Sequence, residues 1–81
     1  MNTEPQLTDP QRSELSKAFG SKPIEGLITF SGYGMGVGLH RRTWERMMSV
    51  LQERGYVIPY VHGGYEITAK GRAAYLGLAF D

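Results

Sequence analysis

The 81-residue chain has no cysteine, which excludes disulfide bonds and thiolate metal sites and allows a reducing compartment. It also has no long apolar run. The longest stretch without a charged residue or histidine lies between Glu25 and His40, contains several glycines and is shorter than the ~20 apolar residues that a membrane helix needs. The N-terminal segment lacks the basic and apolar regions of a secretory signal. These absences predict a cytoplasmic protein that does not enter a membrane.

Catalytic signatures are missing as well. The chain has no H-E-x-x-H motif, no G-x-S-x-G around Ser31 and no pair of carboxylates that a short helix would bring together with a histidine. The alternate glycines of residues 32–38 match neither the phosphate-binding loop nor the dinucleotide fingerprint, and no lysine follows them. We therefore expect no enzymatic activity, no cofactor and no metal.

Charge is scarce overall but unevenly distributed. The net charge of +1 indicates no partner by itself, yet residues 1–38 carry three basic and four acidic side chains, whereas residues 39–81 carry six basic and four acidic. A chain of this length forms one small domain with a thin core, to which dimerisation would add stability. We expect a flexible N-terminus over residues 1–8 and a single domain over residues 9–80.

The first half of the chain predicts a helix and a short strand. Thr8 or Asp9 is a suitable N-cap, Pro10 is tolerated in a first turn and Gly20 is a stop signal, so a helix is expected over residues 9–19. Residues 22–30 contain β-branched and apolar side chains and favour a short extended segment. The glycines of residues 32–38 then predict a loop or a broken helix.

The clearest helix in the sequence covers residues 39–54 and ends at Gly55. Its predicted apolar stripe contains Leu39, Thr43, Met47 and Leu51 at i, i+4 spacing, widened by Trp44, Met48 and Val50. The remaining face is cationic in its N-terminal half and mixed in its C-terminal half.

Two β-rich runs around Gly63 and Gly64 predict a hairpin over residues 56–68. A two-residue turn at these glycines places Tyr60 opposite Ile67. It also gives one face with Tyr56, Ile58, Tyr60, Tyr65 and Ile67, and a second face with Val57, Pro59, Val61 and Glu66. The first strand is expected at a sheet edge because proline lacks an amide donor. Thr68 is expected to cap a terminal helix that Gly71 and Gly77 weaken.

The run from residue 39 to residue 75 resembles the recognition helix and wing of winged helix-turn-helix regulators of the MarR and PadR kind. In that family a basic helix ends in a Leu-x-x-x-Gly-Tyr-Val-like phrase, a hairpin follows, and a Thr-x-x-Gly-Arg-like phrase opens the next helix. The matching residues here are Leu51, Gly55, Tyr56, Val57, Tyr65, Ile67, Thr68, Gly71 and Arg72. The resemblance implies a small α+β winged helix: helix, strand, short or broken helix, recognition helix, hairpin wing and C-terminal helix. The glycine-rich segment stands where the family has its second helix, which braces the recognition helix.

The resemblance implies a DNA-binding protein, either a transcriptional regulator or an architectural factor, that is dimeric on its operator. The N-terminal end of helix 39–54 would enter the major groove of double-stranded DNA, and the hairpin would be the wing. The DNA-binding residues implied are Arg41, Arg42, Thr43 and Arg46 on the helix, His62 in the wing, and Lys70 and Arg72 as phosphate contacts.

Other interpretations of the same residues remain open. The arginines also suit a solvated helix face with i, i+4 ion pairs such as Arg41 to Glu45, and we expect Trp44 in the core rather than stacked on a base. Tyr33 and Met35 are large apolar side chains among glycines. They suggest an alternative function, a winged-helix interaction module that binds a partner protein through residues 31–38 and the adjacent helix face.

Overall fold

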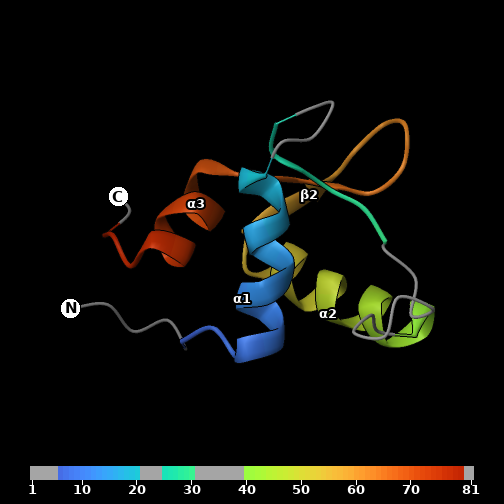
Figure 1. The fold of residues 1–81 in the computed structure, drawn as a ribbon, viewed down its shortest axis with the longest axis horizontal. Helices are drawn as coiled ribbons and strands as arrows, with labels where there is room; N and C mark the ends of the chain where they lie inside the picture. Colours follow the sequence, from blue (N-terminus) through green and yellow to red (C-terminus); the bar gives the residue numbers. More distant parts are fainter. Residues whose placement is uncertain (1–5, 21–24, 31–39, 80–81) are drawn as a thin grey trace.

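The computed structural model describes residues 6–20, 25–30 and 40–79, and these form a small α+β fold (Figure 1). Three α-helices and a three-stranded antiparallel sheet make up the described part. In chain order the elements are α1 (Asp9–Ser16), the 3-10 turn η1 (Lys17–Phe19), β1 (Leu27–Ile28), α2 (Arg41–Glu53), β2 (Val57–Pro59), β3 (Tyr65–Ile67) and α3 (Ala69–Leu76). The predicted loop or broken helix of residues 32–38 lies outside the described residues.

The first helix begins and ends where the sequence predicts. Thr8 is the N-cap: its side chain accepts a hydrogen bond from the amide of Gln11, whose side chain in turn accepts one from the amide of Thr8. The chain then tightens into η1 and leaves helical geometry at Gly20. Leu7, which precedes this cap, packs against the core.

The long helix α2 begins after His40, its N-cap, and ends in a Schellman motif. Gly55 has a φ of 81°. Its amide donates to the carbonyl of Gln52, and the amide of Tyr56 donates to that of Leu51. Gly55 therefore ends the helix as predicted.

The predicted apolar stripe of α2 is confirmed at Trp44, Met48 and Leu51 but is wrong at Thr43 and Val50, and Leu39 lies outside the described residues. The buried residues are Trp44, Met48 and Leu51, whereas Thr43 and Val50 are exposed. The correction follows from size: the large indole turns toward the core, and this rotates Thr43, which has the smaller polar side chain, outward.

The sheet has the strand order β1-β3-β2. Its edge strands are therefore β1 and β2, and Pro59 lies on an edge as predicted. The hairpin strands pair Val57 with Ile67 and Pro59 with Tyr65, and β1 pairs Ile28 with Tyr65.

The predicted turn and register of the hairpin are wrong. The amide of Tyr60 donates to the carbonyl of Gly64, and the amide of Gly63 donates to the carbonyl of Tyr60. The loop thus consists of Val61, His62 and Gly63, with Gly63 at a φ of 101°, which is the three-residue arrangement of a turn followed by a glycine bulge. Tyr60 therefore faces Gly64, not Ile67.

This register shift also changes the face of the first hairpin strand. Since side chains alternate along a strand, a shift by an odd number of residues exchanges the two faces. Val57 therefore shares a face with Ile67, and both are buried, whereas Ile58, which was predicted to lie on the face of Ile67, is 49% exposed.

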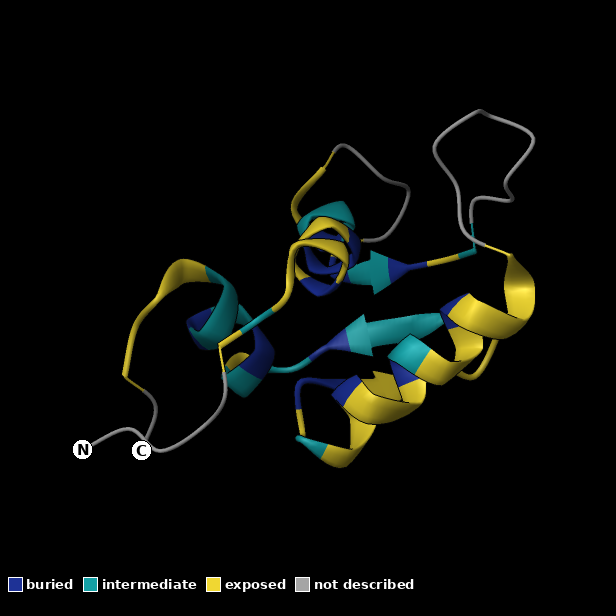
Figure 2. Ribbon diagram, turned by 90° about the horizontal axis from the view of Figure 1, so that it is seen from below, coloured by how far each residue is buried: buried dark blue, intermediate teal, exposed yellow. Residues whose placement is uncertain are grey.

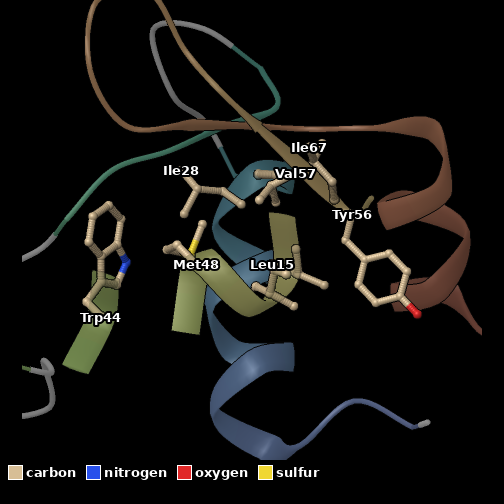
Figure 3. Close-up of a cluster of buried hydrophobic side chains, with 9 residues drawn as sticks. Leu15, Ile28, Trp44, Met48, Tyr56, Val57 and Ile67 are labelled. Atoms are coloured by element: carbon tan, nitrogen blue, oxygen red, sulfur yellow. The ribbon is translucent and has the colours of Figure 1, made fainter. Parts of the chain in front are cut away.

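The core forms between the sheet and the helices α1 and α2 (Figure 3). Leu15 of α1, Ile28 of β1, Met48 and Leu51 of α2, and Val57 of β2 have no exposed surface. Trp44 lies at one end of this cluster and Tyr56 at the other.

The terminal helix α3 is capped by Thr68 as predicted, with the side-chain oxygen of Thr68 accepting from the amide of Gly71 over 3.0 Å. Gly71 was expected to weaken the helix, but it also lets α3 pack closely against the backbone of Tyr56. A Cβ at position 71 would collide with the carbonyl oxygen of Tyr56. Gly77 ends α3 with a φ of 76°. Among the described helices, none is long and apolar enough to cross a membrane.

Candidate nucleic-acid interface

The predicted cationic face lies on the outer side of α2, which is mostly exposed along its length (Figure 2). Arg41, Arg42, Thr43 and Arg46 are all exposed. They occupy the first two turns of the helix, so the structure brings these four predicted residues together at one helix end.

Arg41 is held in place by two neighbours. Its Nε atom donates to Oε2 of Glu45 over 3.2 Å, and its guanidinium carbon lies 5.4 Å from the centre of the Phe30 ring. The expected ion pair with Glu45 is therefore present. Both partners are more than half exposed, so the pair contributes little to stability but partly neutralises this arginine.

Unlike Arg41, Arg42 and Arg46 are not neutralised by a neighbouring carboxylate in the described part of the chain. Neither has a carboxylate partner within the described residues. They lie at i, i+4 spacing and so project from the same side of the helix. Two positive charges are thus available to an anionic partner.

Trp44 fixes the orientation of this face. It is 4% exposed, and its indole N–H donates to Oε1 of Glu14, a buried carboxylate of α1, over 2.9 Å. Its ring contacts Phe30 and Tyr65, with centroids 5.5 and 5.6 Å away. Trp44 is therefore a core residue, as predicted, and it anchors the N-terminal half of α2 to α1 and to the sheet.

The hairpin tip lies beside the N-terminus of α2. The two contribute to one open hollow of about 420 Å³, lined by Leu27, Thr29, Phe30, Arg41, Trp44, Tyr60, His62, Gly63 and Gly64. Gly64 is required for this arrangement, since a Cβ there would lie 2.7 Å from the carbonyl oxygen of Ile28. Arg41 and His62, 21 residues apart in sequence, thus border the same hollow.

At the tip itself, His62 is exposed and contacts the ring of Tyr60 edge to face at 5.7 Å. Val61 beside it is 86% exposed. The predicted wing residue His62 therefore projects from the loop and belongs to the same region as Arg41.

Lys70 and Arg72 do not lie at the N-terminal end of α2 with the other predicted DNA-binding residues. The ammonium group of Lys70 is 5.7 Å from the Tyr56 ring, and the guanidinium of Arg72 is 5.5 Å from the Phe19 ring. Lys70 also lies near Gly55, at the C-terminal end of α2, about 20 Å along the helix from Arg41. The structure does not bring these two predicted phosphate contacts together with the arginines of α2.

Tyr33 and Met35, the predicted partner-binding residues, lie outside the described residues. In the described segments no group of three histidine and carboxylate side chains is placed to hold a metal ion.

Two residues that sequence reasoning did not single out shape the interface. Phe30 supports the guanidinium of Arg41, and Glu14 fixes Trp44. The sequence does hold a signal for Glu14: it is a carboxylate directly before Leu15, on the side of the first helix that is buried. The pairing with Trp44 depends on the tertiary fold.

Comparisons of the chain with protein-family models, with curated proteins and with solved structures give no match. The function is therefore inferred from the residues and their geometry.

Proposed function

We propose that this protein binds double-stranded DNA as a winged helix, with α2 as the recognition helix and the β2–β3 hairpin as the wing. One observation carries the proposal: Arg42 and Arg46 stand exposed near the N-terminus of α2, without a carboxylate partner among the described residues, and the neighbouring Arg41 borders the same hollow as the hairpin tip. This is a regulatory rather than a catalytic activity.

The arrangement suits the dimensions of duplex DNA. The major groove is about 12 Å wide and admits a single α-helix. A helix that enters by its N-terminal end places Arg42, Thr43 and Arg46 near base edges and phosphates, and guanidinium groups can bind guanine O6 and N7 in bidentate fashion. The hairpin tip beside Arg41 then meets the adjacent backbone or minor groove through His62.

The element order and sheet pairing support the winged-helix proposal. A hairpin directly follows α2, and its second strand pairs with the short strand that precedes α2 in sequence. This pairing ties both ends of the segment that carries α2 to one sheet. Trp44 also holds the helix against α1 and the sheet through Glu14 and Tyr65, and a helix held in place loses less entropy on binding.

The interface that we propose is smaller than the predicted set of residues. It contains Arg41, Arg42, Thr43, Arg46 and His62. It leaves out Lys70, which lies near Gly55 at the other end of α2, and Arg72, which lies against Phe19 and Gly26. Two copies on a two-fold operator would place their α2 helices in successive major grooves, about 34 Å apart.

The test is a fluorescence-anisotropy titration of the full chain against a labelled random-sequence duplex, at about 50 mM and about 200 mM salt. DNA binding predicts an affinity that falls steeply with salt. Arg42→Ala and Arg46→Ala should each weaken binding and each lower the salt slope by about one.

The matched control is Arg12→Gln, which removes an exposed arginine of α1 away from the interface and should leave DNA affinity unchanged. If Arg12→Gln weakens binding as much as Arg42→Ala, the attraction is unspecific and the proposed interface is wrong. Absence of binding by the wild type at low salt would exclude DNA binding and favour the protein-interaction module.

A further inference from the structure

A cluster of cationic and aromatic side chains joins α1, η1 and α3, on the side of the molecule away from the N-terminus of α2 (Figure 1). The rings of Phe19 and Tyr75 stack with centroids 4.9 Å apart and planes inclined by 26°. The guanidinium of Arg72 lies 5.5 Å from the Phe19 ring, and that of Arg12 lies 5.2 Å from the Tyr75 ring. The four side chains form one continuous stack.

A hydrogen bond to the backbone fixes one end of this stack, and the other end lies close to Gly26. Arg12 donates from Nη1 to the carbonyl oxygen of Tyr75 over 2.8 Å. At the other end, Nη2 of Arg72 lies so close to Gly26 that a Cβ at this position would be 3.3 Å from it. The guanidinium of Arg12 is thereby held in a defined position, so that little side-chain entropy is lost when a partner meets it.

The positive charge of the stack is not neutralised within the described residues. Neither Arg12 nor Arg72 has a carboxylate partner there, and a contact with an aromatic face leaves the full charge on the guanidinium. Arg12 is exposed and Arg72 is partly exposed. Both can therefore take up an additional anionic group.

Apolar side chains lie next to this charge. Leu76, the last residue of α3, is 57% exposed, and Leu78, two residues after it, is 61% exposed; this end of the chain's described part is exposed (Figure 2). The amide of Leu78 donates to the carbonyl of Ala73 over 2.8 Å, an arrangement that the left-handed Gly77 permits. Leu78 is thus fixed against the end of the helix.

We propose that this region docks an acidic amphipathic segment of another protein. We call it the α1–α3 surface, and it consists of Arg12, Phe19, Arg72, Tyr75, Leu76 and Leu78. Carboxylates of the partner would pair with the two guanidinium groups, and its apolar side chains would cover the two leucines.

Charge complementarity selects this occupant over a second copy of the chain. A symmetric dimer through the α1–α3 surface would bring four guanidinium groups into one interface, and like charges across an interface oppose association. An acidic segment instead supplies the missing carboxylates. The inference stands independently of DNA binding, because it uses none of the residues of the α2 interface.

The test uses the full chain and a labelled synthetic peptide of about 15 residues, in which aspartate and glutamate alternate with leucine and phenylalanine. Its twin carries asparagine and glutamine at the acidic positions. Anisotropy titrations should show the acidic peptide binding at least about tenfold more tightly than the twin, and more weakly as salt is raised. Arg12→Gln and Leu78→Ser should each weaken binding of the acidic peptide at least about fivefold.

The matched control is Arg46→Gln, an exposed arginine of α2, which should change peptide affinity by less than about twofold. Circular dichroism and thermal unfolding confirm that each variant is folded. Equal affinity for the two peptides would overturn the proposal, as would equal losses in Arg46→Gln and Arg12→Gln. A dimer detected by light scattering and dissociated by Leu78→Ser would overturn it too, since a second copy would then occupy the surface.

Discussion

The indole N–H of Trp44 donates to Oε1 of Glu14 over 2.9 Å, and this buried contact joins residues 30 positions apart. Lys17 pairs with the same carboxylate oxygen at 2.9 Å. A buried carboxylate is stable only when it is hydrogen-bonded or paired, and Glu14 has both kinds of partner. The contact ties α2, the proposed recognition helix, to α1.

Replacement of Glu14 by alanine should destabilise the protein by about 2 to 3 kcal/mol, since it leaves the buried indole N–H without an acceptor. Glu14→Gln keeps an acceptor oxygen and should have a smaller effect. Lys17→Gln removes the partly exposed ion pair with Glu14 and should change stability by less than about 1 kcal/mol. Urea unfolding followed by the fluorescence of Trp44, the single tryptophan, measures all three. Equal losses for Glu14→Ala and Glu14→Gln would show that the hydrogen bond is unimportant.

The Gly71→Ala variant should be destabilised by about 1 to 3 kcal/mol, although alanine favours helices, because the added methyl group overpacks a filled space. Its Cβ would lie 2.9 Å from Cγ1 of Ile67 and would collide with the carbonyl oxygen of Tyr56. Gly63→Ala is the comparison: a Cβ there meets no atom within 4 Å, so only backbone strain opposes it. Thermal unfolding that ranks Gly63→Ala as the more damaging change would contradict this account.

Thr68 connects two helices, since it caps α3 and donates from its hydroxyl to the carbonyl of Gly55 over 2.6 Å. We expect Thr68→Ala to lower stability by about 1 to 2 kcal/mol, the usual effect of losing an N-cap side chain. Thr68→Ser retains the hydroxyl and should behave nearly as the wild type in the same denaturation experiment. A serine variant as unstable as the alanine variant would assign the effect to the lost methyl group instead.

Within the proposed function, Glu45→Gln should strengthen DNA binding. Glu45 partly neutralises Arg41, and its removal frees one more guanidinium for a phosphate. The salt slope should increase in magnitude by up to about one. Glu53→Gln, which removes an exposed carboxylate from the other end of α2, is the control. An unchanged slope in Glu45→Gln, measured by anisotropy, would show that Arg41 does not reach the DNA backbone.

Several elements of the fold could be predicted because their signals are local. Thr8 and Thr68 cap helices through bonds to residues three positions away, and Gly55 ends α2 because glycine adopts positive φ readily. The exposed arginines of α2 follow in the same way from helical periodicity.

Errors arose where a local pattern allows two solutions. Paired glycines suit a two-residue turn, yet only Gly63 serves in the loop and Gly64 lies against the backbone of Ile28. Gly64 lies there because β3 pairs with β1 in the sheet. Nothing in the sequence of the hairpin itself predicts this pairing. The position of Arg72 is similar: near Thr68 in sequence, it is placed by Phe19 and Gly26 from the first half of the chain.

The sequence by itself determined the order of the elements, their caps and the cationic side of α2, because periodicity and capping act over a few residues. The tertiary structure alone decided which strand face is buried, that Arg41 and His62 border one hollow, and that Arg12 and Arg72 meet across two stacked rings. These relationships join segments far apart in the chain, and their geometry exists only once the core has packed.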